Sequence, residues 1–487
     1  MIKDQTHSKK IRHQLLPWVA AFALFMQTLD STILNTALPS IAKDLGESPL
    51  NLQSIIISYT LTVALLIPVS GWLADRFGTQ RVFRIAIFIF TLGSLFCGLS
   101  TNLEQLIASR ILQAVGGSMM VPVARLVILY AYPKEKLLQV INFITIPAMV
   151  GPVIGPTVGG FLVEYVSWHW IFLINIPIGI AVVWLASYSI PNFVNKVKRL
   201  DYIGLLLFGG GLSLLTLLLE LTSSDIISVS TALLLLLLAV GLLLLYGWRA
   251  KRIDYPLIDL DLFKIRTLRI SVFGNIATRL GIGGLSLLIP LMLQVGFGYP
   301  AFIAGMIMIP FALSNLIGKS FVVPVVTRLG YKRTLIGNTL LLGTLIASFY
   351  FLRSTTPLYV IVGILLVHGL INSVQFTAMN TLALADLTKD NSSEGNSLLA
   401  VTQQLAVSFG ISIASFILLF FQNTEKLQVG EESHIFNNSF LVLGIITILS
   451  TLVFMQLKTT DGENLSRKKQ WKEKRVKKVH LKEKAAS

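Results

Sequence analysis

Long apolar runs recur along the whole chain and limit what it can fold into. Of the 487 residues, 54% are hydrophobic and only 13% are charged, whereas a soluble domain carries roughly 25% charged residues. Each run is about 20 residues long, which is enough to cross a bilayer as a helix. The sequence therefore predicts an all-α integral membrane protein with fourteen membrane-spanning helices. The runs fall at about 15–38, 51–73, 81–100, 104–128, 138–163, 168–190, 201–222, 229–248, 270–293, 302–323, 334–352, 357–384, 395–421 and 438–457.

Lysine and arginine follow a regular pattern between these runs. The termini and every second connection are rich in them, whereas the remaining connections hold only Lys43, Arg353 and Lys426. Because positive residues favour the cytoplasmic loops of membrane proteins, we expect a multi-pass protein of the cell inner membrane with both termini in the cytoplasm. The net charge of +16 then reflects topology, and no nucleic-acid partner is expected. The basic tail, 458–487, either lies on anionic lipid or extends into solvent.

Two loops recur at nearly the same offset. Pro39 and Pro49 flank the loop after the first run, and Pro290 and Pro300 flank the loop after the ninth, 251 positions later. The loop "GWLADRFGTQR" after the second run likewise matches "VPVVTRLGYKR" after the tenth, where the Arg-x-Gly-x-x-Arg pattern returns at an offset of 252. Duplicated halves explain both offsets.

Eight spans separate the equivalent points, so two extra helices lie between two six-helix bundles. The extra helices, 201–222 and 229–248, contain few polar residues and are expected to be peripheral and to face lipid. The predicted organisation is a cytoplasmic N-terminus (1–14), an N-terminal bundle (15–190), a linker with the two extra helices (191–266), a C-terminal bundle (267–457) and a basic cytoplasmic tail (458–487). Parallel six-helix repeats of this kind occur in major facilitator transporters.

Four local patterns occur in order along the first half: "LDSTILNTALPSIA" (29–42), "GWLADRFGTQR" (71–81), "RILQAVGGSMMVPV" (110–123) and "GPVIGPTVGG" (151–160). Together they resemble the motifs of the major facilitator superfamily, specifically its fourteen-helix drug:proton antiporter branch. The segment "SWHWIFLINIPIG" (167–179) is similar to the start of the sixth helix in that branch. The resemblance implies the major facilitator fold and transport by alternating access, with a proton gradient as the energy source.

Asp30 and Arg110 are the most informative pair of residues, because ionisable groups inside apolar spans are costly and usually functional. At 1.5 Å per helical residue they lie roughly 14 Å and 12 Å below the same outer face, so we expect them to approach each other. An arginine favours the charged carboxylate while burial favours the neutral one, and the resemblance implies a proton-coupling role for Arg110. The alternative is a static ion pair that fixes helix packing.

The loop 71–81 is the candidate conformational latch, with Gly71, Asp75, Arg76, Gly78 and Arg81 as its residues. Its glycines permit a tight turn, and its aspartate is expected to cap a short helix or to pair with Arg81 or Arg84. The resemblance implies that this loop holds one conformation of the transport cycle, although Thr79 and Gln80 replace residues that are often basic in the family. The alternative is a plain cytoplasmic loop whose ion pair contributes at most about 1 kcal/mol.

The stretch "GPVIGPTVGG" is interpreted as part of a helix. Gly151, Gly155 and Gly159 recur every four residues and so share one helix face, which lets a partner helix approach closely. Pro152 and Pro156 are expected to bend the helix. The resemblance implies that this motif, which ends with Gly160, marks exporters; the glycine that begins the longer family motif is replaced here by Asn142.

Polar residues within other spans are candidates for a substrate cavity. Such residues also serve simply to join helices by hydrogen bonds, so only some of them should contact cargo. Cations outnumber carboxylates among the ionisable groups of the spans, which favours anionic or zwitterionic cargo. The candidates are Gln27, Asn35, Arg279, His368, Asn372, Gln375 and Gln403.

These observations favour a proton-coupled antiporter that exports small organic molecules, as in multidrug efflux. The first alternative is export of an anionic metabolite or metal chelate, such as an organic acid or siderophore; a non-coupled channel or membrane receptor ranks below it. No phosphate-binding loop or catalytic metal motif occurs, so no enzyme activity, metal or cofactor is expected. The expected partners are the small-molecule substrate, protons and the lipid bilayer, and the protein is expected to be a monomer.

Overall fold

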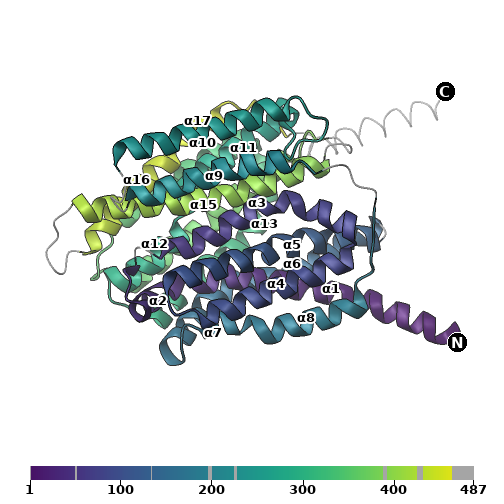
Figure 1. Cartoon of the computed structure of the whole chain (residues 1–487). Coiled ribbons are helices and arrows are strands. Elements are labelled where there is room, and N and C mark those ends of the chain that lie inside the picture. Colours follow the sequence, from purple (N-terminus) through teal and green to yellow (C-terminus); the bar gives the residue numbers. More distant parts are fainter. Residues whose placement is uncertain are drawn as a thin grey trace, which may run out of the picture.

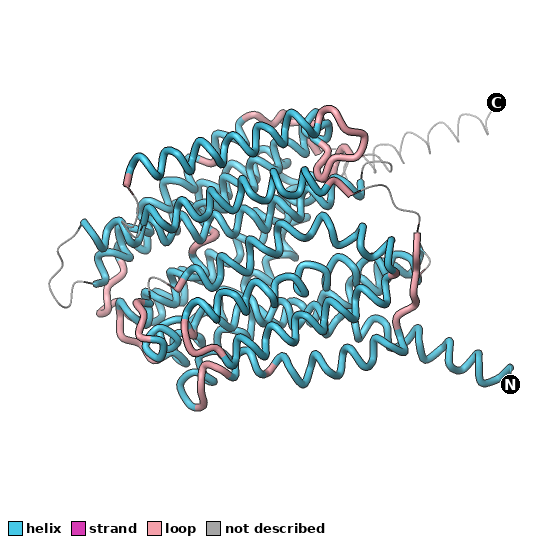
Figure 2. Tube along the Cα trace, viewed as in Figure 1, coloured by secondary structure: helices cyan, strands magenta, loops and turns pink. Residues whose placement is uncertain are grey.

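The structure is a computed structural model that describes residues 2–49, 52–132, 134–195, 200–223, 228–387, 392–424 and 432–462. Within these ranges nearly the whole chain is helical and no strand occurs (Figure 2). The long helices lie side by side in one bundle and run in roughly the same direction across the molecule (Figure 1). The predicted all-α class is confirmed.

The first six spans form helices that pack closely on one another. The first span is interrupted near its end by a short 3-10 turn, and its helix begins at Ile2, so it extends through residues 2–14, which were predicted as a separate N-terminal segment. The closest neighbours are α1 with α6, α4 with α5, and α3 with α5. The elements are α1 (Ile2–Ile33), η1 (Leu34–Thr36), α2 (Leu38–Leu45), α3 (Gln53–Phe77), α4 (Thr79–Leu99), α5 (Leu103–Ala131), α6 (Lys134–Tyr165), α7 (Trp170–Leu173) and α8 (Asn175–Ser189).

The two extra helices, α9 (Tyr202–Ser223) and α10 (Val229–Ala250), pack against each other, and α9 also packs on α3 and α15. Asp201 ties the pair together, because its Oδ1 accepts hydrogen bonds from the Gly204 N–H at 2.8 Å and from Arg249 Nη2 at 3.1 Å. The outer face of α10 is apolar and exposed, for example at Leu237, which is 70% exposed. This face suits contact with lipid, as expected for a peripheral pair.

The last six spans form the second set of helices. The ninth span is broken after α11, where Gly283 and Gly284 lie directly against Gly410 and Ala414 of α15. The elements are η3 (Leu260–Lys264), α11 (Arg266–Ile282), α12 (Leu285–Leu291), the π-helix η4 (Met292–Gly296), α13 (Ala301–Ser348), η5 (Phe349–Phe351), α14 (Leu358–Ala383), α15 (Ser392–Thr424), α16 (Glu432–Leu449) and α17 (Thr451–Met455).

The number of membrane crossings agrees with the fourteen predicted from the sequence. Twelve helical segments of the described chain are long and apolar enough to cross a membrane. One of them, Ala301–Phe351, is 51 residues long and turns at Gly330 (φ 78°, ψ 163°), so it contains two crossings. The helix α1, which is less apolar because it carries Gln27 and Asp30, adds the last one. Fourteen crossings return the chain to the end of the bundle at which it began.

The turn at Gly330 also supports the repeat seen in the sequence. Gly78, its equivalent at an offset of 252, likewise has a positive φ (95°) and separates α3 from α4. Both glycines thus make the same sharp turn between consecutive crossings, a backbone conformation that residues with a Cβ rarely adopt.

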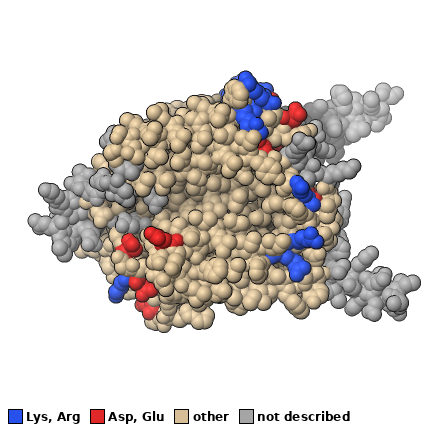
Figure 3. Space-filling view, in the orientation of Figure 1, with Lys and Arg blue, Asp and Glu red and all other residues tan. Residues whose placement is uncertain are grey.

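Charged side chains are concentrated at the two ends of the bundle. On the face shown in Figure 3, Lys and Arg gather mainly at the end that carries the N-terminus, and most Asp and Glu lie at the opposite end. A broad band with neither charge separates them, as expected for the part of a protein that lies within the hydrocarbon core.

Candidate functional site

Asp30 and Arg110 form a buried ion pair, as the sequence predicted. Arg110 Nη1 donates to Asp30 Oδ2 at 2.7 Å, and the two side chains are 1% and 0% exposed. Asp30 lies one turn before the end of α1, and Arg110 lies two turns into α5. The pair therefore joins the first and fourth spans within the N-terminal half.

Three polar residues complete the hydrogen bonding of this pair. Gln113 is the centre: its Nε2 donates to Asp30 Oδ1 at 2.7 Å and to Ser94 Oγ at 2.7 Å, and its Oε1 accepts from Arg110 Nη1 at 2.5 Å. Asn175 Nδ2 also donates to Asp30 Oδ1, at 3.2 Å. The sequence analysis did not identify these residues, although Gln113 lies one helical turn after Arg110 in the same quoted motif.

Aromatic rings cover the guanidinium group. The Arg110 Cζ atom lies 4.2 Å from the centroid of the Tyr59 ring and 5.7 Å from that of Phe172. Cation–π contacts of this kind stabilise a cation away from water. Residues of α1, α3, α4, α5, α7 and the start of α8 thus enclose the ion pair.

The loop 71–81 differs from the predicted charge latch in this conformation. Asp75 pairs with neither Arg81 nor Arg84; its Oδ1 accepts hydrogen bonds from Asn195 Nδ2 at 2.8 Å and from the Tyr130 hydroxyl at 3.2 Å. Arg81 and Arg84 are exposed. The hydrogen bonds of Asp75 therefore stay within the N-terminal half and the segment that leads to α9.

Only one of the two glycines of this loop makes the turn. Gly78 has φ 95°, and a side chain there would overlap Asn192, whereas Gly71 lies inside α3 with open space around it. The residues that depart from the family pattern provide further contacts. Thr79 Oγ1 donates to the Pro191 carbonyl at 2.9 Å, and Gln80 Nε2 donates to the Ser187 carbonyl at 2.8 Å. Thr79 and Gln80 thus hold the end of α8.

The stretch 151–160 lies within α6, which continues through all of its prolines. Its three glycines face α1 and η1, where Thr28, Thr32 and Thr36 also recur every four residues. A side chain on Gly151 or Gly155 would overlap Thr28 or Thr32, and one on Gly159 would overlap the Ile33 carbonyl. Two of the threonine hydroxyls donate across this interface: Thr32 Oγ1 to the Gly151 carbonyl at 3.4 Å and Thr36 Oγ1 to the Pro156 carbonyl at 3.0 Å. The predicted close approach of a partner helix is confirmed, and the partner is the helix that carries Asp30.

The two halves pack on each other through α3 and α15. They also meet, through α6 and α13, at the end of the bundle opposite the N-terminus, which we call the closed end. There the backbone of α6 at Gly160 lies directly against Ala301 at the start of α13, and Gly305 lies against the Pro156 carbonyl. Glu164 Oε2 accepts a hydrogen bond from the Phe302 N–H at 3.0 Å, and so caps the first turn of a helix from the other half.

A cavity lies between the two halves, on the side of the closed end that faces the termini. It consists of two adjoining parts of about 440 and 260 Å³, and their combined volume is within the usual range for small-molecule sites. Both parts are lined by Ser286, Met308, Phe311, Asn315 and Lys319. The N-terminal half contributes Asn35 and, from α6, Pro152 and Pro156. The glycine face of α6 thus packs on α1 while its prolines line this central cavity.

Two cations and no carboxylate line the described wall of the central cavity. Arg279 Nε donates to Asn275 Oδ1 at 2.7 Å, and its Cζ atom lies 4.1 Å from the Phe376 ring centroid. Lys319 contacts Met149 Sδ at 3.7 Å and is exposed. Among the described residues neither cation has an ion-pair partner. The cavity is therefore electropositive.

Four of the seven predicted cavity residues line it: Asn35, Arg279, His368 and Asn372. Gln375 is fully buried and donates to Thr339 Oγ1 at 2.7 Å, and Gln403 donates to Asn380 Oδ1 at 2.7 Å from behind the wall. Gln27 does not line either part of the cavity. Ser286 and Asn315 do, and the sequence analysis missed them; they are polar residues within apolar runs.

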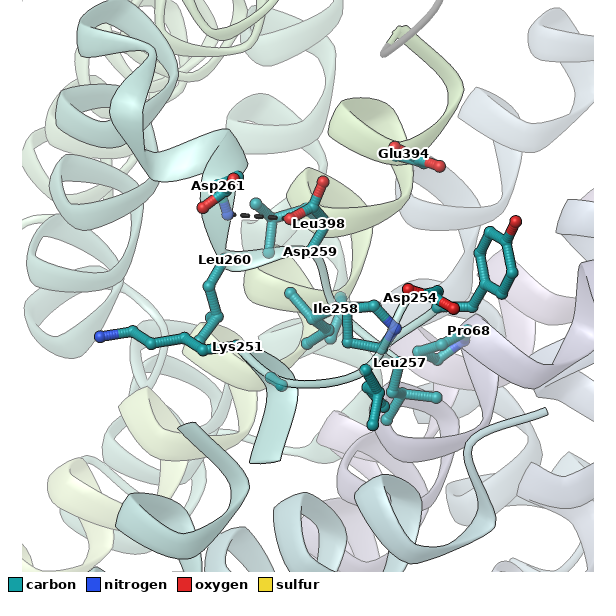
Figure 4. Close-up of a pocket in the computed structure, with 15 residues that line it drawn as sticks. Pro68, Lys251, Asp254, Leu257, Ile258, Asp259, Leu260, Asp261, Glu394 and Leu398 are labelled. Carbon is teal, nitrogen blue, oxygen red and sulfur yellow. Dashed lines mark hydrogen bonds between the residues drawn. The ribbon is translucent and has the colours of Figure 1, made fainter. Parts of the chain in front are cut away.

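A second cavity, of about 550 Å³, lies beside the linker (Figure 4). It is lined by the segment 250–261 after α10, by Pro68 of α3 and by Glu394 and Leu398 of α15. The Asp261 N–H donates to Asp259 Oδ1 at 2.9 Å, and the Tyr246 hydroxyl holds Ile258 through both its N–H and its carbonyl. Its wall contains neither Asp30 nor Arg279, so it is separate from the candidate site.

Known proteins resemble this chain over nearly its full length. It is 44% identical over 457 residues to a protein of Klebsiella pneumoniae subsp. pneumoniae named "Putative multidrug resistance protein MdtD", covering 93% of this chain and 96% of that one. A protein of the same name from Salmonella typhimurium is 42% identical over 449 residues, with 92% and 96% covered.

Solved transporters share the fold at low sequence identity. A POT family transporter, PepTSo, gives a TM-score of 0.65 at 14% identity, with 91% of this chain and 97% of the other covered. A D-xylose–proton symporter gives 0.63 at 15% identity, with 92% and 98% covered. A bacterial homologue of the lysosomal transporter Spinster, in an inward-facing and unoccupied conformation, gives 0.62 at 14% identity, with 91% and 98% covered.

A family profile provides the remaining comparison. The profile described as Major Facilitator Superfamily matches residues 20–410 and 271–486. The repeated turn at Gly78 and Gly330, the two packed halves and the cavity between them agree with this match. The chain belongs to the major facilitator superfamily of membrane transporters.

Proposed function

We propose that this chain exports small organic molecules from the cytoplasm in exchange for protons, by alternating access. The fold and the relatives identify it as a secondary transporter. The observation that carries the finer proposal is the separation of a sealed ion pair from an open cavity. Asp30 and Arg110 are buried in the N-terminal half, whereas the central cavity lies between the halves. The first offers a group that can bind a proton, and the second offers space for cargo.

The positions of the contacts and of the cavity support an inward-open state. Gly160, Glu164 and Gly305 close the end opposite the N-terminus, and the cavity wall extends away from them toward Lys319 and Asn380. Since the distribution of Lys and Arg predicts cytoplasmic termini, the cavity in this conformation opens to the cytoplasm. An exporter collects its cargo in such a state.

The ion pair suggests how proton binding and helix movement are linked. In the sealed state Arg110 and Gln113 occupy both oxygens of Asp30. Separation of α1 and α5 removes these partners, and a proton then replaces Arg110 as the group that neutralises the carboxylate. Because α6 packs on α1 through its glycines and lines the cavity through its prolines, movement of α1 also changes the shape of the cavity.

One observation favours the second candidate cargo class, a small organic anion. Lipophilic cations, which multidrug exporters commonly carry, would meet Arg279 and Lys319 with no carboxylate in the described cavity wall. An organic anion would instead be attracted to these two cations. The electropositive wall therefore supports export of an organic anion as a second candidate function, in addition to multidrug-type efflux.

The decisive test measures flux across a membrane under an imposed pH gradient. Comparing the compounds that accumulate in cells with and without the protein identifies cargo, and that cargo is then loaded into proteoliposomes containing the purified protein. We expect the gradient to accelerate flux by the wild type. Flux by Asp30→Asn should be the same with and without the gradient. Wild-type flux that is indifferent to the gradient would support the uncoupled alternative instead.

A further inference from the structure

Three neighbouring side chains on α14 have buried polar atoms without hydrogen-bond partners. Both ring nitrogens of His368, Oδ1 of Asn372 and Oγ of Ser373 are unpaired. The three residues are 1%, 8% and 2% exposed, and all three line the larger part of the central cavity. His368 and Asn372 are four residues apart and share one helix face, and Ser373 follows Asn372 directly.

Unpaired buried polar groups are unusual in proteins. Each costs about 1–3 kcal/mol when it lacks a partner, so a cluster of them in a cavity wall indicates a site at which a ligand supplies the missing bonds. The polar groups around Asp30 are the contrast: both carboxylate oxygens and the Gln113 amide are satisfied by neighbouring side chains. Asn175 Oδ1 beside that ion pair also lacks a partner, so the two clusters differ in position: the unpaired atoms of α14 belong to residues that line the central cavity.

The surroundings of the three residues define what they could bind. The guanidinium of Arg279, on α11, lies over the ring of Phe376 and is positioned by a hydrogen bond that it donates to Asn275. Phe376 is two turns after His368 on α14. The Phe311 ring lies 5.5 Å from the imidazole of His368, between centroids. A neutral imidazole offers one donor and one acceptor, an amide oxygen accepts, and a hydroxyl does both. Arg279 supplies only donors.

We propose that cargo is recognised mainly by the C-terminal half, at a subsite formed by Arg279, His368, Asn372 and Ser373. The assignment rests on the proposed transport function and extends it. Arg279 binds an anionic group of the cargo, and Asn372 and His368 bind an N–H or O–H group of the same molecule. Asp30 and Arg110 in the other half then sense protons without touching cargo, so coupling passes through the movement of helices.

Gln375 provides the matched control on the same helix. It lies seven residues after His368 and was an equal candidate from sequence. Its Nε2 donates to Thr339, and its Oε1 lacks a partner as the subsite atoms do, but its side chain is fully buried outside the cavity wall. The single cysteine, Cys97, is also fully buried. A cysteine introduced at His368 or Gln375 is therefore measured against an unreactive background, which the wild-type protein verifies.

The test uses two thiol reagents of similar size and opposite charge, sulfonatoethyl and trimethylammonioethyl methanethiosulfonate. Labelling rates are measured on purified full-length protein in nanodiscs for His368→Cys, Asn372→Cys and Gln375→Cys, and are normalised to the rates of a free thiol. We expect the first two variants to react and the anionic reagent to be favoured over the cationic one by about tenfold or more, because charges that line a cleft concentrate ions of opposite sign. Adding Arg279→Gln should remove most of that preference.

Each outcome decides the assignment. Unreactive cysteines at both 368 and 372, reaction at 375 as fast as at 368, or a preference for the cationic reagent would overturn it. If His368→Cys does not fold, Asn372→Cys gives the same information. The measurement needs neither a known cargo nor a pH gradient, so it is independent of the flux test. Failure of coupled flux would reject the proposed antiport but not this subsite. Failure of the labelling test would reject the subsite but not the antiport.

Discussion

Arg110 Nη1 lies 2.7 Å from Asp30 Oδ2 where α5 meets α1, and both side chains are essentially inaccessible to solvent. Removing one member of such a pair leaves a buried charge without compensation, which costs about 3–5 kcal/mol. We therefore expect Arg110→Ala to lower thermal stability strongly, and the double variant Asp30→Asn/Arg110→Gln to recover a large part of the loss.

Thermal unfolding of the purified variants in nanodiscs measures this effect. Arg125→Ala is the control, because Arg125 lies on the same helix and is exposed; its stability should stay within about 0.5 kcal/mol of the wild type. A double variant as unstable as Arg110→Ala would contradict the interpretation that the unpaired charge, rather than lost packing, causes the damage.

The glycine face of α6 leads to a second prediction. At Gly155 a Cβ would overlap Thr32 of α1, so Gly155→Leu should push α6 away from α1 and abolish export, with the protein still inserted in the membrane. Gly241→Leu is the matched control, since nothing lies within 4 Å of a Cβ at that position in α10. Export by cells and the amount of protein in the membrane fraction are the two readouts. Full activity of Gly155→Leu would show that the close approach is not required.

The two glycines of the loop 71–81 should respond in opposite ways to the same substitution. Gly78→Ala forces a side chain onto a backbone with φ 95° and onto Asn192, and should destabilise the protein by about 1 kcal/mol or more. Gly71→Ala lies inside α3 with open space around it and should be neutral or stabilising by up to about 1 kcal/mol. Unfolding temperatures of the two variants, measured side by side, distinguish the glycine that makes the turn from the one that does not.

The sequence predicted the elements whose signals are local or repeated. The length of the apolar runs gives the spans, and the shared offset gives the duplicated halves, which the positive φ at both Gly78 and Gly330 supports. The depth of Asp30 and Arg110 placed them together because rise per residue in a helix is fixed. Their partners Ser94 and Asn175 come from other helices, and no spacing in the sequence indicates which polar residue of a distant span faces inward.

The remaining differences depend on which distant segment each side chain meets, and no local pattern in the sequence gives that. Gln375 and Asn372 lie three residues apart on α14, yet one donates to Thr339 and the other lines the cavity. In a membrane both faces of such a helix are apolar, so hydropathy does not separate them. Asp75 is similar: its charge suggested Arg81 or Arg84 as partners, but Asn195, which arrives from 120 residues later in the chain, occupies the position instead.

Substitution of Arg279 tests whether the cargo is an anion or a cation. Arg279 is held by Asn275 and Phe376 at the wall of the central cavity and has no ion-pair partner among the described residues. If cargo is anionic, Arg279→Ala removes a charge-assisted hydrogen bond of about 1.5–3 kcal/mol, which corresponds to roughly a tenfold to hundredfold loss in the efficiency of export. Export of a lipophilic cation would be unchanged or faster.

The variant Arg269→Ala is the control for the general loss of positive charge, because Arg269 is an exposed arginine on the same helix. It should leave export intact. Transport of the identified cargo by both variants, compared at equal amounts of protein in the membrane, gives the answer: equal activity of Arg279→Ala and the wild type would exclude an anionic cargo bound at this position.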